Sequence, residues 1–133
     1  MLIYKNNDKV YCYIHIPKNS GKFIRNNIKN NLDNTVLKEY WGQDEKLDIA
    51  HIPFIYKNYY INFLKVQYIN YYTYTRNPYN RVISGFFYLN PESNINDFKN
   101  WVKETLIKYD FNKNFNRKII HYYPQYIFIC NSE

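Results

Sequence analysis

Glycine, proline and cysteine are scarce in this chain of 133 residues, which contains three, five and two of them, respectively. Each glycine or proline therefore helps to locate a turn or the end of a helix or strand. The two cysteines, Cys12 and Cys130, have neither CxxC nor metal-ligand spacing, so we expect two buried free thiols. No stretch reaches the ~20 apolar residues of a membrane span, and the N-terminal residues lack the apolar core of a signal peptide. The sequence therefore predicts a soluble, intracellular protein.

The chain is rich in aromatic and basic residues. Aromatics make up 21% of it, which predicts a folded protein, because disordered segments are poor in aromatics. Its length predicts a single domain over residues 1–133. The net charge of +7 favours anionic partners such as nucleotides, nucleic acids, acidic glycans or membrane surfaces. The many Asn and Tyr residues are typical of AT-rich coding and receive no weight by number alone.

Strands and helices alternate along the sequence. The pattern predicts strands over 10–16, 71–75 and 126–129, a strand or extended loop over 47–52, and helices over 22–31, 54–64, 78–89 and 95–109. This alternation predicts an α/β fold with a parallel sheet flanked by helices. Ligands bind such sheets at the carboxyl ends of the strands. Lys18 and Arg76 follow two of the strands, so we expect them on one edge of the sheet.

The segment from His15 to Lys22 reads HIPKNSGK and follows the first strand. Small residues in the turn and a helix directly after it predict a phosphate site, because backbone N–H groups at a helix N-terminus bind anions. Gly21 allows close approach of the backbone, and Lys18 and Lys22 add positive charge. The alternative is a basic surface turn with no ligand.

The segment from Arg76 to Phe86 follows the strand over 71–75. Asn77 and Pro78 have the residue types of a helix N-cap and first helical position. Ser84 lies eight residues after Arg76, two turns into the predicted helix, so a guanidinium and a hydroxyl are expected to converge on one phosphate.

A Walker A loop is a competing interpretation of the first segment. Gly21 and Lys22 match the end of GxxxxGK[ST]. However, Ile16 stands at the first glycine, and Phe23 replaces the hydroxyl residue that binds magnesium. These two mismatches disfavour a P-loop nucleotide kinase or NTPase.

The two segments PKNSG and RNPYNRVISGFF together resemble the donor-binding motifs of the sulfotransferase superfamily, which uses 3'-phosphoadenylyl sulfate (PAPS). The carbohydrate branch, including heparan sulfate sulfotransferases, is the most similar. The resemblance implies a sheet like that of P-loop NTPases and a PAPS site. In this site Lys18, Asn19, Ser20, Gly21 and Lys22 would hold the 5'-phosphosulfate. It also implies that Arg76 and Ser84 hold the 3'-phosphate.

Two shorter segments extend the resemblance. AHIPF, at residues 50–54, is similar to the family segment that carries the proposed general base, which falls on His51. HYYPQ, at residues 121–125, is similar to the family's HxxPQ stretch. The implied reaction moves the sulfuryl group of PAPS to an acceptor hydroxyl, expected on a glycan. Lys18 would stabilise the leaving group, and no metal is implied.

The sequence departs from the family where Lys22 and Phe23 replace the usual Ser/Thr after the loop glycine. A catalytically inactive PAPS-binding relative is therefore an alternative. A nucleic-acid-binding module is a weaker one, because the basic residues are scattered and no known RNA-binding signature occurs. For Trp41 and Trp101 we expect core positions, and for His15 local packing within the first strand.

Overall fold

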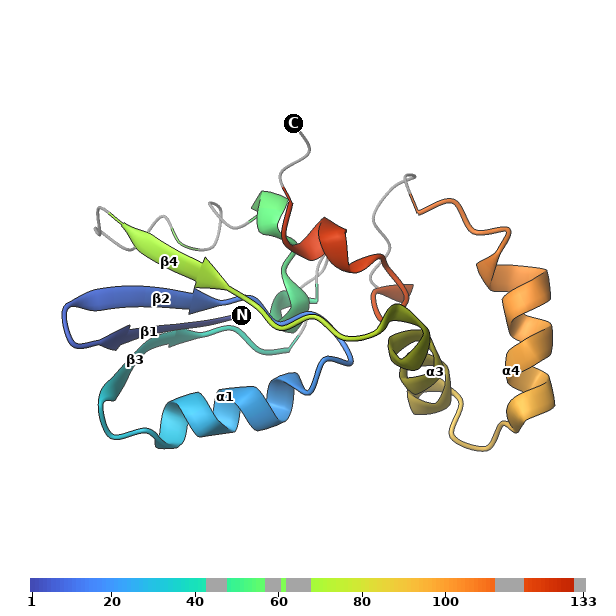
Figure 1. Cartoon of the computed structure of the whole chain (residues 1–133), viewed down its shortest axis with the longest axis horizontal. Helices are drawn as coiled ribbons and strands as arrows, with labels where there is room; N and C mark the ends of the chain where they lie inside the picture. Colours follow the sequence, from blue (N-terminus) through green and yellow to red (C-terminus); the bar gives the residue numbers. More distant parts are fainter. Residues whose placement is uncertain (43–47, 57–60, 62–67, 112–118, 131–133) are drawn as a thin grey trace.

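The computed structural model describes residues 1–42, 48–56, 61, 68–111 and 119–130. It is an α/β fold built on an open four-stranded sheet with the order β3-β1-β2-β4 (Figure 1). The strands are β1 (Leu2–Asn6), β2 (Lys9–Tyr13), β3 (Asn34–Glu39) and β4 (Ile69–Tyr72). The sheet and α1 (Gly21–Asn30) form one end of the molecule, and the helices after β4 form the other.

The sheet is mixed, so the expectation of an all-parallel sheet was wrong. Only β2 and β4 are parallel, whereas β1 pairs antiparallel with both β2 and β3. The sequence pattern did not identify β1. A two-residue turn joins β1 to β2, and so short a connection can only join antiparallel strands. Asn7 in this turn has φ of 49°, a left-handed conformation that asparagine tolerates.

Asparagine caps start two of the helices, and the first of these caps was predicted. The Asn77 side chain accepts hydrogen bonds from the backbone N–H groups of Tyr79 and Asn80, and Pro78 starts α3 (Pro78–Leu89). A capping box of Asn94 and Asp97 starts α4 (Ile95–Trp101), which continues into a π-helical turn, Val102–Leu106. None of the helices in the described part of the chain has the length and hydrophobicity needed to cross a membrane.

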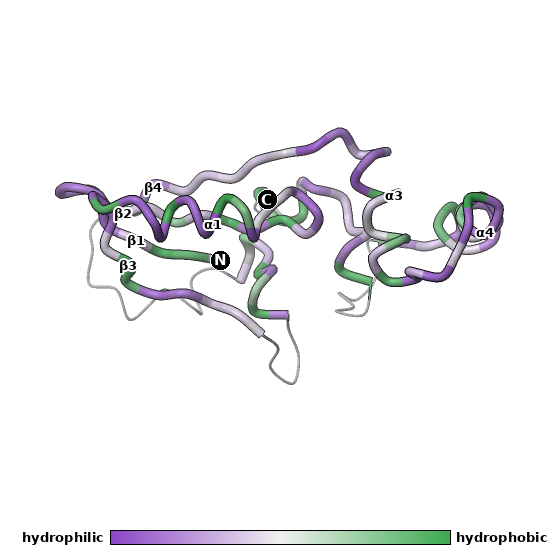
Figure 2. The backbone as a smooth tube through the Cα atoms, turned by 90° about the horizontal axis from the view of Figure 1, so that it is seen from below, coloured by the Kyte–Doolittle hydropathy of each residue, from purple (hydrophilic) through white to green (hydrophobic). Residues whose placement is uncertain are grey.

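The core joins the sheet to the C-terminal segment. Its buried members include Ile3, Cys12 and Ile14 from the sheet region and Tyr123 and Phe128 from the C-terminal region. Figure 2 shows β1 as hydrophobic near the N-terminus, whereas α1 alternates between hydrophilic and hydrophobic residues. Residues from both ends of the sequence therefore pack against each other and position the segments between them.

Several short segments differ from the sequence predictions. The expected strand over 126–129 mostly forms part of a 3-10 helix, Gln125–Phe128, and the segment over 47–52 before Pro53 contains another, Ile49–His51. The expected helix over 54–64 begins as a 3-10 turn, Phe54–Tyr56, and most of its remainder lies outside the described residues. Short apolar runs do not distinguish strands from buried turns, which explains these errors.

Candidate functional site

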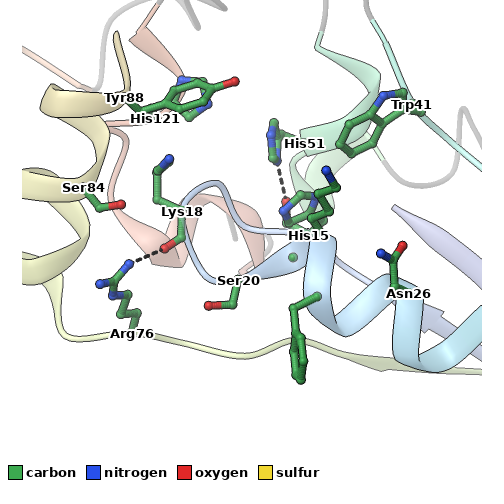
Figure 3. A pocket seen from close by; sticks show the side chains of 13 residues that line it. His15, Lys18, Ser20, Asn26, Trp41, His51, Arg76, Ser84, Tyr88 and His121 are labelled. Carbon is green, nitrogen blue, oxygen red and sulfur yellow. Dashed lines mark hydrogen bonds between the residues drawn. The ribbon is translucent and has the colours of Figure 1, made fainter. Parts of the chain in front are cut away.

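A cavity of about 800 Å3 opens where the carboxyl ends of β2 and β4 meet (Figure 3). Because these strands are parallel, the loops that follow them emerge side by side. The cavity is lined by His15, Lys18, Ser20, Gly21, Lys22, Phe23, Asn26, Trp41, His51, Arg76, Ser84, Tyr88 and His121. The structure thus brings together all the predicted site residues except Asn19.

The first loop contains two left-handed residues, with φ of 65° at Lys18 and 59° at Ser20. Ser20 is the N-cap of α1, but its side chain makes no capping hydrogen bond. The Lys18 ammonium lies 3.8 Å from the centre of the Tyr88 ring. Partial burial lowers the pKa of Lys18, and the nearby Arg76 lowers it further. The loop therefore presents a partly desolvated cation beside the first N–H groups of α1.

Gly21 is required by packing rather than by an unusual backbone angle. A Cβ built on Gly21 would lie 1.7 Å from Nε2 of His15, whose ring covers this position. His15 follows the end of β2 rather than lying within it, and it is 6% exposed. The close approach that the sequence predicted at Gly21 is therefore made by an imidazole of the same chain.

The second loop brings Arg76 against the first. Arg76 Nη1 donates to the carbonyl oxygen of Lys18 at 3.0 Å, and the side chain is otherwise exposed (Figure 3). Ser84, two turns into α3, lines the same cavity and is half-buried. The guanidinium uses one of its donors in this contact, so others are available to an anion in the cavity.

Gln125 holds the two loops together. Its Oε1 accepts from Asn19 Nδ2 at 2.8 Å and from the Arg76 backbone N–H at 2.9 Å, and its Nε2 donates to the Arg76 carbonyl at 2.7 Å. Asn19 also donates to the carbonyl of Tyr74 at 2.7 Å and is 4% exposed. The Asn19 side chain thus joins the loops instead of lining the cavity, and Gln125 is a positioning residue that was not predicted.

Like Gln125, Arg81 joins segments that are distant in the sequence, and its side chain is 2% exposed. Its Nε donates to the Pro17 carbonyl at 2.8 Å, and its Nη1 donates to the Tyr123 carbonyl at 2.7 Å. Burial lowers its pKa to about 10, so the guanidinium remains charged at neutral pH. Only its place near Arg76 in the sequence could have suggested this role.

All three histidines of the chain line the cavity. The rings of His15 and His51 lie 4.3 Å apart, and those of His51 and His121 lie 5.7 Å apart. His51 Nδ1 is 3.0 Å from the carbonyl oxygen of His15. Because a carbonyl only accepts, Nδ1 carries the proton and Nε2 of His51 keeps a free lone pair.

Burial keeps these imidazoles neutral. Together with smaller effects of neighbouring charged groups and histidines, burial lowers the pKa of His15 to about 2 and the pKa of His51 and of His121 to about 4. The carbonyl hydrogen bond raises the pKa of His51 but does not offset burial. The pKa of His51 therefore lies well below the ordinary histidine value near 6.5.

We expect the free energy of unfolding to fall as the pH drops from about 6.5 to 5, because the histidines are protonated on unfolding. Most carboxylates titrate only at lower pH. In the unfolded chain the histidines regain ordinary values near 6.5, so the unfolded state binds more protons there. Each histidine contributes on the order of 1 kcal/mol per pH unit over this interval. Melting temperatures from pH 7.5 to 5 measure the effect. His121→Gln should reduce the slope, and an unchanged slope would contradict the neutral, buried state.

Three aromatic residues that line the cavity, Phe23, Trp41 and Tyr88, are exposed. Trp41 is 55% exposed and Phe23 is 70% exposed, so the core position predicted for Trp41 was wrong. The Arg25 guanidinium lies 3.9 Å from the centre of the Trp41 ring and is ion-paired with Glu39.

Both cysteines are free thiols. Cys12 is buried as expected, whereas Cys130 is exposed, so the expectation of two buried thiols was wrong for Cys130.

The cavity is electropositive. Lys18, Lys22 and Arg76 line it, and no carboxylate is among its described lining residues. Within the described ranges, no group of three or more His, Cys, Asp or Glu residues could hold a metal ion. This charge pattern suits an anionic ligand, and the neutral histidines suit proton transfer.

The comparisons with known proteins identify no relative. No protein-family model matches the chain, and neither a curated protein nor a solved structure matches it. The α/β fold and the geometry of the cavity are therefore the structural basis for any functional proposal.

Proposed function

We propose that this protein is a PAPS-dependent sulfotransferase that acts on a hydroxyl group, expected on a carbohydrate. One observation carries the proposal: Lys18, His51 and the pair Arg76 and Ser84, from three segments far apart in the sequence, line a single cavity. An electropositive cavity beside the start of a helix suits a donor with two phosphate-like ends. The motif resemblance supports the same donor.

The cavity offers different partners to the two ends of PAPS. The backbone N–H groups at the start of α1, with Lys18 and Lys22, would hold the 5'-phosphosulfate. Arg76 and Ser84 would hold the 3'-phosphate. Lys22 would supply a charge in place of the hydroxyl usual after the loop glycine. The hydrogen bonds of Gln125 fix the spacing between these two groups.

The proposed reaction is an in-line displacement at sulfur. The bond between the sulfuryl group and the 5'-phosphate oxygen breaks as the acceptor oxygen bonds to sulfur, and the acceptor proton passes to His51 Nε2. Lys18 stabilises the negative charge on the departing 3'-phosphoadenosine 5'-phosphate (PAP). The carbonyl of His15 holds His51 in the tautomer that can accept a proton.

PAP should stabilise the protein more than AMP or ADP does. Arg76 and Ser84 would contact the 3'-phosphate, which only PAP carries. A ligand at 100 times its Kd adds about 2.7 kcal/mol to the unfolding free energy. Thermal shifts at equal nucleotide concentrations measure the difference. Equal shifts with PAP and AMP would overturn the donor assignment, whereas PAP binding without transfer would favour an inactive relative.

Arg76→Ala should weaken PAP binding about ten- to a hundredfold without unfolding the protein. A charge-assisted hydrogen bond to phosphate contributes roughly 1.5–3 kcal/mol. Arg76 is exposed, so its removal leaves no buried group unpaired. Lys99→Ala is a matched control, because it removes an exposed cation on α4. Equal losses of affinity in both variants would show that Arg76 contributes only to the net charge of the protein and makes no specific contact with PAP.

A further inference from the structure

A second depression, of about 470 Å3, lies between α1 and β4 and shares no lining residue with the cavity. We call it the tyrosine–asparagine groove. It is lined by Tyr4, Asn6, Tyr11, Asn27, Ile28, Asn31, Asn34, Tyr72 and Tyr74. None of these described lining residues is charged, although the chain carries a net charge of +7. The groove therefore suits a neutral ligand.

The tyrosines hold one another in place. Tyr4 and Tyr11 are cross-strand partners in β1 and β2, and their rings stack with centres 5.4 Å apart. Tyr72 meets Tyr4 edge-on, and the two hydroxyl oxygens lie 3.0 Å apart. Tyr74 lies beside Tyr72 and is 54% exposed. Three rings thus form a fixed wall, and Tyr74 presents an accessible aromatic surface.

Two asparagines, Asn27 on α1 and Asn31 at the C-cap of this helix, provide complementary polar atoms. They are four residues apart in the sequence, and both line the groove. Asn27 Nδ2 donates to the Phe23 carbonyl at 2.9 Å, and Asn31 Oδ1 accepts from the Asp33 N–H at 3.0 Å. In the described part of the chain, the Asn27 acceptor and the Asn31 donor have no further partner. A hydroxyl group both donates and accepts, so it suits such a pair.

We propose that the tyrosine–asparagine groove binds a neutral carbohydrate chain. The apolar face of a pyranose ring would pack on Tyr74, and its hydroxyls would hydrogen-bond to Asn27 and Asn31. An acidic glycan or nucleic acid would need cations that the described lining does not provide. The volume is within the usual range for small-ligand sites. The inference rests on the placement of these side chains, and it goes beyond the proposed sulfuryl transfer without depending on it.

The test uses defined neutral tetrasaccharides as probes: cellotetraose, maltotetraose, mannotetraose and chitotetraose. We expect at least one to give saturation-transfer signals and a calorimetric isotherm that added salt does not weaken. Tyr74→Ala and Asn27→Ala should each weaken this binding at least fivefold, whereas PAP affinity should not change. Tyr74→Phe, which keeps the ring, should retain most of the binding.

Three results would overturn the proposal. The first is no binding by any of the four probes, and the second is equal binding by wild type and Tyr74→Ala. The third is tighter occupation of the groove by a proline-rich peptide, which also docks on aromatic surfaces. If Tyr74→Ala does not fold, Asn27→Asp replaces it, because Asn27 is exposed on α1. PAP binding is measured on the same samples, so failure of the groove and failure of the donor site are distinguishable.

Discussion

His51→Ala should lower the rate of sulfuryl transfer by roughly 10²–10⁴-fold while leaving PAP affinity nearly unchanged. A positioned general base usually contributes this much. Nε2 of His51 has the free lone pair that the reaction needs, because Nδ1 faces the His15 carbonyl. Transfer of labelled sulfate from PAPS over a glycan panel measures the rate, and calorimetry with PAP measures the affinity. Wild-type turnover in His51→Ala would eliminate this residue as the base.

The pH profile provides an independent readout of the same assignment. Because burial lowers the pKa of His51 to about 4, the base stays unprotonated well below neutrality. Wild-type activity should therefore remain level from pH 7 to about 5.5 and fall only toward pH 4. A decline centred at pH 6.5 would identify a solvent-exposed base instead.

Lys18→Ala separates the donor side from the acceptor side. It should lower transfer to every acceptor, because Lys18 would act on the leaving group common to all. PAPS affinity should fall only modestly, since the N–H groups of α1 remain. Lys22→Ala, which removes the neighbouring cation in the first turn of α1, is the matched comparison. A larger loss of turnover in Lys22→Ala than in Lys18→Ala would reverse the two roles.

Gly21→Ala should destabilise the protein by roughly 1–3 kcal/mol, the usual cost of overpacking, and should distort the cavity. The added Cβ would lie 1.7 Å from the His15 ring, so the ring or the start of α1 must move. Gly85→Ala is the matched control within a helix, because its Cβ would lie 3.2 Å from the nearest atom, in Tyr122. Chemical denaturation of both variants measures the two effects.

A double-mutant cycle identifies the cause of the Gly21 effect. Removing the ring with His15→Ala should make the Gly21→Ala substitution much less costly. If Gly21→Ala is as harmful in the His15→Ala background as in wild type, the imidazole is not the obstacle. In that case the backbone of the loop would be responsible.

The sequence predicted the elements with strong local signals. Asn77 and Pro78 at the start of α3 were recognised because capping depends only on nearby residues. The two loops were recognised because each follows an apolar run and combines turn residues with a Lys or Arg. In the structure they follow β2 and β4, which are parallel neighbours. The strand predicted over 10–16 overlaps β2, whereas β1 was missed, since polar residues interrupt its apolar pattern.

The parts that could not be predicted depend on contacts between distant residues. Nothing near Arg81 in the sequence shows that its partners are the carbonyls of Pro17 and Tyr123. The same holds for Gln125 and for the shifted pKa values of the histidines, which result from burial by several segments. Asn19 lies in a loop that the sequence identified, but its predicted place in the cavity was wrong. Its side chain instead donates to Gln125, a distant residue.

The hydrogen bond between Asn19 and Gln125 joins residues that are 106 positions apart in a chain of 133. Closing so long a loop costs chain entropy that local structure cannot offset early in folding. The hairpin and α1 can form from nearby residues, but the two loops acquire their fixed spacing only when the C-terminal segment docks. Ligand competence should therefore arise in the last kinetic phase of refolding, after most secondary structure has appeared. A protease cut between α4 and Gln125 should likewise abolish binding before it disrupts the sheet.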